Sequence, residues 1–495
     1  MEWFGRLSTL IRDACWRGDA GRVQSPRSSK EVPETGWSEG GQEGGYVMNK
    51  KKEERPAVVA ETPTQAGEAG ILEKWRWTEP SVWTERMLTA LERGVKGGKW
   101  FSLMDKVYSW GNLESAWEKV KANKGAAGVD EQSLESFQAN CERYLGELQR
   151  DLRDDLYKAK PVKRVWIPKP GSKEKRPLGI PAVKDRVVQT ALRNVLEPIF
   201  EKSFAEHSYG FRPGRGCKDA LRRVEKLLKT GKTWVVDIDI RKYFDTIPHG
   251  LLMKEVGNQV SDGRILDLIK GYLKQGIMEG HQVWEPEVGT PQGAVISPLL
   301  GNVYLNPVDH EMTRKGFEMI RYADDTVVLC ATQEEAERAL KEVRALIEER
   351  GLLLHPEKTR IVDASIKGGF DFLGYHFERN TRWPRKKSMD QIKDTIRRKT
   401  KRTSGHSLKT VIDDVNQSLR GWFEYFRHSA RLTFCILDRW IRVRLRSILR
   451  KRNGLKGRGR GFDHLKWPNA YFTKHGLFTL TAAYETACRS RCGNH

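Results

Sequence analysis

Aspartates at two places in the chain form the group of residues best suited to chemistry. Asp237 and Asp239 lie in the segment DIDIRKYFD, and Asp324 and Asp325 are neighbours in the segment YADD. Adjacent carboxylates repel each other, and a bound cation relieves that repulsion. A third carboxylate beside the pair would complete an oxygen cage for two Mg²⁺ ions, which activate a hydroxyl and stabilise a leaving phosphate. The pair alone is weak evidence, because turns favour aspartate for backbone reasons.

Both aspartate groups are expected at the ends of β-strands. Residues 234–240 (WVVDIDI) alternate and are rich in β-branched side chains, which predicts a strand. Residues 319–322 and 326–330 predict two more strands, joined by a turn at Ala323-Asp324-Asp325. Helical patterns precede and follow them at 186–200, 264–273 and 333–351. This mixture favours an α+β fold over a doubly wound parallel sheet.

Positive charge gathers at the C-terminal end of the 495-residue chain. Residues 381–495 contain 28 Lys and Arg against 8 Asp and Glu, so they carry +20 of the net +23. The pattern there is almost entirely helical, and four arginines lie at helical spacing opposite an apolar stripe: Arg439, Arg442, Arg446 and Arg450. We interpret these arginines as a phosphate-binding face, with a solvated or membrane-surface face as the alternatives. Nucleic acid is the partner that such segregated charge favours.

The remaining composition excludes several classes of protein. Seven scattered cysteines indicate free thiols in a reducing compartment. Cys488 and Cys492 form one close pair with no second pair upstream, so a structural zinc site is disfavoured. The chain has neither a run of about 18 apolar residues nor a secretion signal. A cytoplasmic protein with no membrane partner is expected.

Eight sequence blocks follow one another in an order that is more specific than any block alone. They are KGAAGVD (124–130), IPKPGSKEKRPLGIP (167–181), AEHSYGFRPGRGCKDA (205–220), DIDIRKYFDTI (237–247), GTPQGAVISPLLGNVYLN (289–306), RYADD (321–325), LHPEKTRIV (354–362) and FDFLGYHF (370–377). Together they resemble the reverse-transcriptase domain of group II intron-encoded proteins, over roughly residues 100–455. LRGWFEYFRHSA (419–430) resembles the maturase, or thumb, region that follows the polymerase in that family.

The resemblance implies a right-hand polymerase. Its fingers and palm would be built on an antiparallel sheet and followed by an all-α thumb or maturase (X) domain. The chain would then divide into a loosely ordered extension (1–70), a helical part of the fingers (71–160), fingers and palm (161–378), thumb and maturase domain (379–455) and a basic, aromatic tail that is a candidate DNA-binding segment (456–495).

The resemblance also implies roles for the aspartates. Asp239, Asp324 and Asp325 match the family's catalytic, metal-holding residues, and Ile240 would belong to both the metal and the nucleotide site. Asp237 competes with Asp239 because the two share a strand face. We favour Asp239, because Phe244 then falls where the family places an aromatic ring under the sugar to select deoxynucleotides. Core packing is the alternative role for that ring.

Further residues match the family's nucleotide and nucleic-acid contacts. Lys169 and Arg176 resemble the pair that contacts the triphosphate, with Lys173 and Lys175 as competitors. Gln292 resembles the residue beside the nascent base pair. The other expected contacts are Arg212 and Arg215 to template phosphates, for which a salt-bridged surface is the alternative, and Lys358 beside the site.

The sequence therefore predicts an RNA-directed DNA polymerase that uses two Mg²⁺ ions and dNTPs. Its expected partners are the intron RNA, an RNA template–DNA primer duplex and target DNA. Cys488, Cys492 and His495 do not make the HNH endonuclease found in many family members, so no second-strand cleavage is expected. A non-catalytic maturase that only binds RNA and a reverse transcriptase recruited to host defence are the competing functions.

Overall fold

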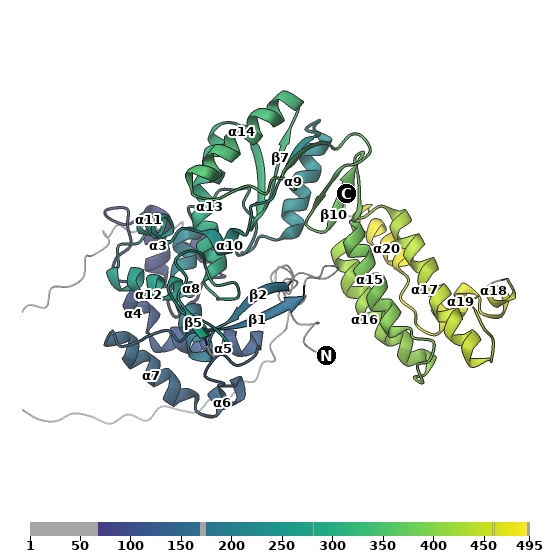
Figure 1. Cartoon of the computed structure of the whole chain (residues 1–495), viewed down its shortest axis with the longest axis horizontal. Coiled ribbons are helices and arrows are strands. Elements are labelled where there is room, and N and C mark those ends of the chain that lie inside the picture. The colour runs from purple at the N-terminus through teal and green to yellow at the C-terminus, as the bar shows by residue number, and fades with distance from the viewer. Residues whose placement is uncertain (1–67, 169–174, 281, 458, 460, 493–495) are drawn as a thin grey trace, which may run out of the picture.

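The computed structural model describes residues 68–168, 175–280, 282–457, 459 and 461–492. Most of the expected N-terminal extension therefore lies outside the described residues. The first described part is helical and lies at the lower left of Figure 1. Its helices are α2 (Glu68–Lys74), α3 (Glu85–Arg93), α4 (Met104–Val107), α5 (Trp110–Asn123), α6 (Leu134–Ala139) and α7 (Cys141–Arg153).

A four-stranded sheet, which we call the fingers sheet, follows these helices. It consists of β1 (Val162–Pro168), β2 (Lys175–Ile180), β4 (Ile277–Glu279) and β5 (Gln282–Trp284), in the order β2-β1-β4-β5. β1 and β2 form an antiparallel pair, whereas β4 joins β1 in parallel. This sheet is therefore mixed rather than purely antiparallel, and its two short strands β4 and β5 were not predicted from the sequence.

A second four-stranded sheet, the palm sheet, is antiparallel throughout. Its strands are β3 (Trp234–Ile238), β6 (Glu318–Tyr322), β7 (Asp325–Cys330) and β8 (Arg360–Asp363), in the order β6-β7-β3-β8. Successive side chains of a strand point to opposite faces. Val235 accordingly packs in a cluster with α9 (Cys217–Lys229), and Val236 packs in a cluster with α14 (Gln333–Glu349). Because helices cover both faces, the strands are apolar on both sides.

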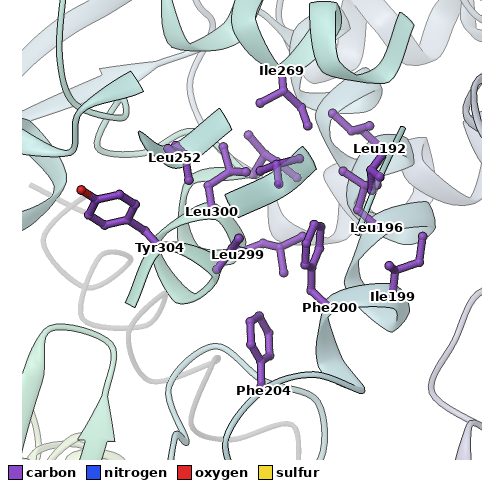
Figure 2. Close-up of a cluster of buried hydrophobic side chains, with 14 of the residues drawn as sticks. Leu192, Leu196, Ile199, Phe200, Phe204, Leu252, Ile269, Leu299, Leu300 and Tyr304 are labelled. Carbon is purple, nitrogen blue, oxygen red and sulfur yellow. The ribbon is translucent and has the colours of Figure 1, made fainter. Parts of the chain in front are cut away.

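Helix α8 (Val183–Glu201) joins the fingers to the palm. Its side chains Leu192, Leu196 and Phe200 pack close to Leu299 and Leu300, as Figure 2 shows. These two leucines belong to α13 (Ser297–Arg314), and the same core includes residues of α10 (Tyr243–Thr246), α11 (His249–Gly257) and α12 (Gly263–Leu273). One continuous core therefore joins the palm sheet to these helices and to the N-terminal helices of the fingers.

The C-terminal part is a small sheet followed by a separate body of helices, at the right of Figure 1. The strands β9 (Phe370–Phe372), β10 (Tyr375–Glu378) and β11 (Thr381–Pro384) pair in the order β11-β10-β9. The helices are α15 (Lys386–Lys399), α16 (Leu408–Phe426), α17 (Arg431–Arg452), α18 (Phe462–Lys466), α19 (Asn469–Lys474) and α20 (Leu480–Cys492). They share their own apolar core. Tyr375 Oη donates to the Tyr425 carbonyl over 2.6 Å, which ties the sheet to α16.

The expected α+β fold followed by an all-helical part is confirmed. The expected strand at 234–240 becomes β3, and the two strands around the YADD turn become β6 and β7. The domain boundaries remain predictions. No helix among the described residues combines the length and the apolar character that crossing a bilayer requires.

Candidate active site

The palm sheet brings the three aspartates to one edge. β3 pairs with β7 up to Ile238 opposite Thr326, and one further step in this register places Asp239 opposite Asp325. Asp324 lies in the turn between β6 and β7, where Ala323 has a left-handed φ of +60°. Strand alternation and a tight turn thus bring together carboxylates that are more than 80 residues apart in the sequence.

Gly210 makes room for this turn. A Cβ atom on Gly210 would lie 2.3 Å from the backbone nitrogen of Ala323, a distance that no side chain tolerates. Tyr209 N also donates to the carbonyl of Arg321 over 2.8 Å, so the YGFRPGR segment runs directly along β6. Glycine at position 210 is therefore required for close approach of the backbone to the aspartate turn.

A buried ion pair between Arg321 and Asp309 supports the turn. Arg321 on β6 is 2% exposed, and its Nε donates to both carboxylate oxygens of Asp309 over 2.8 and 3.0 Å. Its Nη1 donates to the Ala323 carbonyl over 3.0 Å and to Asn302 Oδ1 over 2.9 Å. Asn302 in turn donates to the Gly210 carbonyl over 2.7 Å. One arginine therefore links helix α13, the aspartate turn and the YGFRPGR segment.

The carboxyl groups of Asp324 and Asp325 lie in an environment that disfavours their ionised form. Burial raises the pKa of Asp325 to about 6, and the charge of Asp324 adds to that shift. Burial also raises the pKa of Asp324, against the opposing charge of Arg176. Both residues still reach solvent. A divalent cation would relieve this crowding, because it favours the ionised form of each carboxylate.

Asp239 has a positively charged neighbour, Lys358. Lys358 Nζ lies 3.1 and 3.2 Å from the two carboxylate oxygens of Asp239. The His355 amide donates to the Asp239 carbonyl over 2.8 Å, which anchors the Lys358 segment beside the strand end. Lys358 was expected beside the site, in a supporting role and among the nucleic-acid contacts, and the structure places it on the candidate catalytic carboxylate.

The donor set suits a hard divalent cation, but the side chains do not form a ready-made cage. No three His, Cys, Asp or Glu side chains within the described ranges converge closely enough to hold a metal ion. Lys358 supplies the counter-charge at Asp239 in this arrangement. Metal binding would therefore need Asp239 to exchange its contact with Lys358 for one with the cation.

The competing residue Asp237 lies two positions earlier on β3. Its carboxylate lies 3.5 Å from Arg360 Nε on β8, and burial raises its pKa to about 6. Ile240 is buried and bridges to Leu354. The hydrogen bonds of that bridge use the Arg241 amide and the Asp239 carbonyl, so the carbonyl of Ile240 points to the opposite side, toward the aspartate turn.

The PQG segment lies between the palm and the fingers sheet. Gln292 Nε2 donates to Asp245 Oδ1 over 3.0 Å, and the Gly179 amide on β2 donates to the Gln292 carbonyl over 2.6 Å. Gly289 and Gly293 have φ of +90° and +110°, and a Cβ on either would meet backbone atoms at 2.8 Å or less. The sequence identified Gln292 as a nucleotide contact, and the structure adds Asp245 as the residue that positions its side chain.

Of the remaining expected nucleotide contacts, Arg176 and Phe244 are described. Arg176 lies exposed on β2, and its charge acts on Asp324. The Phe244 ring packs against Gly301 of α13, where a Cβ would lie 3.0 Å from the ring. Lys169 and its competitor Lys173 lie outside the described residues.

The Arg212 side chain is too buried to contact a template strand. Its side chain is 2% exposed and forms a salt bridge with Glu201 at 2.7 Å. It also donates to the carbonyls of Ala205 and Ser208 over 2.6 and 2.7 Å. These bonds engage the guanidinium in holding the YGFRPGR turn, so the expected phosphate contact of Arg212 is wrong. Arg215 is half-exposed and donates to the Glu206 carbonyl.

The expected arginine face of α17 is divided between two roles. Arg446 is buried and donates to the Trp467 carbonyl over 2.9 Å, and Arg450 pairs with Asp463 at 2.6 Å. Both hold the C-terminal helices together, which corrects their assignment as phosphate contacts. Arg439 is exposed and Arg442 is half-exposed, so these two still face outward.

Two family models match the chain. One describes a reverse transcriptase (RNA-dependent DNA polymerase) and matches residues 167–377; the other describes a group II intron, maturase-specific domain and matches residues 389–466. The first covers the palm sheet and every candidate catalytic aspartate, and the second covers α15 to α18 apart from the first three residues of α15.

Similar proteins agree with these models. Protein YkfC of Escherichia coli is 34% identical over 62% of this chain and 87% of its own length. Group II intron-encoded protein LtrA of Lactococcus lactis is 37% identical over 39% of this chain and 32% of its own length. A putative COX1/OXI3 intron 1 protein of Saccharomyces cerevisiae is 27% identical over 70% of this chain and 48% of its own length. The matched stretches thus span less than half of the latter two proteins.

Replacing Arg321 with methionine tests the support beneath the turn. The Arg321→Met variant leaves Asp309 buried without a partner, which we expect to cost about 3–5 kcal/mol of stability. The Arg321→Met/Asp309→Leu double variant should recover much of that loss, because no charge then remains buried. Urea unfolding of the three proteins provides the measurement. A loss below about 1 kcal/mol in the single variant would show that the ion pair does not support the palm.

Proposed function

This chain belongs to the family of group II intron-encoded reverse transcriptases, and we propose that its activity is RNA-templated DNA synthesis at Asp239, Asp324 and Asp325. The observation that carries the proposal is the meeting of these three carboxylates at one edge of the palm sheet. Burial raises the pKa of Asp324 and Asp325, and a bound metal ion would relieve the crowding of these two carboxylates.

The three aspartates are the residues that would hold two Mg²⁺ ions, with the Ile240 carbonyl as a further oxygen donor. When bound, such ions activate the attacking 3′-hydroxyl and neutralise charge on the phosphates. The chain's own contribution is to hold the carboxylates together on the turn that Arg321 supports. Lys358 would hold the Asp239 carboxylate in place until a metal ion takes over its contact.

The nucleotide would lie between the palm sheet and the fingers sheet. Arg176 is exposed, and its positive charge acts on Asp324. With Lys169, it would offset the charge of the triphosphate. The Phe244 ring would lie under the sugar, where it would collide with a 2′-hydroxyl. Its packing against Gly301 supports this role, because a ring that is held in place by this contact would exclude a 2′-hydroxyl by steric clash.

RNA and DNA binding follow from the two domains, and their detailed partners are part of the proposal. The polymerase part would hold an RNA template–DNA primer duplex, and the helices from α15 onward would hold the intron RNA. The charge of +20 over residues 381–495 supports this assignment. Arg439 and Arg442 are the outward-facing arginines of α17, and residues 456–495 would contact target DNA. The divisions at residues 70, 160, 378 and 455 are proposed as domain boundaries.

One observation favours a second function. Lys358 already pairs with Asp239, and no described residues form a preassembled metal cluster. A maturase that has kept the polymerase fold only to bind RNA would show the same pairing. The three acids favour the active enzyme, because a site that no longer catalyses a reaction has no need for carboxylates that repel each other.

Primer extension on an RNA template with dNTPs and Mg²⁺ tests the proposed activity. We expect the wild-type protein to extend the primer and the Asp324→Ala variant to lose extension while it still binds structured RNA. Arg176→Gln serves as an intermediate case, in which the KM for dNTP rises and some extension remains. Tight RNA binding without extension by the wild type would favour the splicing-factor function.

The contact between Asp245 and Gln292 gives a sharper test of the nucleotide site. The Asp245→Ala variant removes the acceptor for Gln292 and should raise the KM for dNTP roughly fivefold, as expected for one lost hydrogen bond of about 1 kcal/mol. The Asp245→Asn variant keeps an acceptor oxygen and should stay close to the wild type. Steady-state kinetics on one primer–template distinguishes them, and equal KM values for all three proteins would remove Asp245 from the site.

A further inference from the structure

A cavity of about 410 Å³ lies where the palm meets the C-terminal helices. It is lined by helix α9 of the palm, by strands β10 and β11, and by the C-terminal end of α16 with the two residues after it. Figure 1 shows α9 and β10 at this junction. None of the three candidate catalytic aspartates, all of which the structure describes, lines the cavity. It is therefore a separate site with room for a small ligand, and we call it the junction pocket.

Positively charged side chains gather around the junction pocket. Lys218 and Arg222 lie one turn apart on α9, Arg382 extends from β11, and Arg427 follows α16. Glu225 is the one acid among the described residues that line the pocket. Cations that converge on a concave site from three different elements favour an anionic ligand.

Ion pairs offset only part of this positive charge. Oε1 of Glu424 lies 3.0 Å from Lys218 Nζ and 3.4 Å from Arg427 Nη1, so one carboxylate serves two cations. Arg222 and Arg382 have acidic partners of their own, at 2.6 and 2.8 Å. The pocket therefore keeps an excess of positive charge that a bound anion would balance.

Arg427 also has a donor that lacks an acceptor. Its Nε is buried, and no residue that the structure describes accepts a hydrogen bond from it. A buried donor without an acceptor is unfavourable, and an oxygen atom of a bound anion would complete it. Guanidinium and ammonium groups together are the side chains that bind phosphate oxygens most effectively.

We propose that the junction pocket binds a phosphate group. Arg222 and Arg427 would donate to its oxygens from opposite sides of the pocket, and Lys218 would add charge. Free pyrophosphate and the phosphodiester of a bound RNA present the same oxygens, so these are the two sources to distinguish. A carboxylate is the competing anion, because arginine binds it with similar geometry.

A bound phosphate group would strengthen an existing connection between the palm and the C-terminal helices. Arg382 Nε donates to the His428 carbonyl over 3.0 Å, and the Ala430 amide donates to the Arg382 carbonyl over 2.9 Å. A phosphate held by Arg222 and Arg427 would add a bridge from α9 to the end of α16. Binding should therefore restrain the C-terminal helices relative to the palm. This inference goes beyond the proposed function, because it requires no DNA synthesis.

Titration calorimetry of the full chain with pyrophosphate tests the junction pocket. A chelator removes divalent metal ions and so suppresses binding at the aspartates, and the ionic strength is held constant. We expect wild-type protein to bind and the Arg427→Gln and Arg222→Gln variants each to lose affinity roughly tenfold, as expected for one lost hydrogen bond to a charged group. The Arg222 side chain is 65% exposed, so its replacement should leave the fold intact. Arg344→Gln is the control, because Arg344 is exposed on α14 and does not line the pocket.

Hydrogen–deuterium exchange locates the bound anion. Pyrophosphate should slow amide exchange at residues 375–384 and 424–430 of the wild type, and it should not do so in Arg427→Gln. Repeating the titration with saturating structured RNA identifies the natural source of the phosphate. Weaker pyrophosphate binding would show that an RNA phosphodiester occupies the pocket, whereas unchanged binding would show that the pocket takes a free anion.

Several results would overturn the proposal. They are a wild type that does not bind pyrophosphate, equal affinity in the wild type and both pocket variants, an equal loss in Arg344→Gln, and equal affinity for succinate, which would reassign the site to carboxylates. Primer extension by the same proteins keeps these outcomes distinct from failure of the proposed activity, since pyrophosphate binding is measured without metal or template.

Discussion

Mutual repulsion of carboxylates at the edge of the palm sheet is the constraint on which the rest of this structure depends. Asp239 and Asp325 meet because β3 and β7 are paired, and Asp324 follows from the turn. The protein stabilises the backbone of the turn through Arg321, whose guanidinium is fully engaged by Asp309, Asn302 and the Ala323 carbonyl. It leaves the two carboxylates of the turn without a strong cation of their own, which is the condition under which a divalent ion binds.

The segments around the turn are built for close approach. Gly210 lets the backbone of the YGFRPGR segment contact the backbone of the aspartate turn. Gly289 and Gly293 let the PQG segment contact both the palm and β2. Side chains at these places would separate the palm from the fingers. The palm sheet carries the carboxylates, the fingers sheet carries Arg176, and the PQG segment with Gln292 contacts both sides. Chemistry and substrate recognition therefore depend on the same few backbone contacts.

Sequence patterns predicted the parts of this arrangement that local rules govern. Alternation identified β3, and the YADD pair identified the turn, because strand and turn preferences are local. The arginines were harder: Arg212, Arg446 and Arg450 look like phosphate contacts in sequence, yet each satisfies protein oxygens that only the fold brings near. The partners of Lys358 and Asp245 could not be read from the sequence for the same reason, since they lie 119 and 47 residues away. Charge in a sequence shows what a side chain carries, whereas its partner depends on tertiary contacts.

Titration with Mn²⁺, followed by electron paramagnetic resonance, tests most directly whether the three aspartates act as one metal site. With a primer–template and a non-hydrolysable dNTP analogue bound, we expect two ions per chain in the wild type and a loss of both in the Asp324→Asn variant. Affinity should rise as the pH increases through about 6, because a proton on Asp325 competes with the metal below that value. The Asp237→Asn variant should keep both ions. Unchanged binding in Asp324→Asn, or its loss in Asp237→Asn alone, would contradict the account.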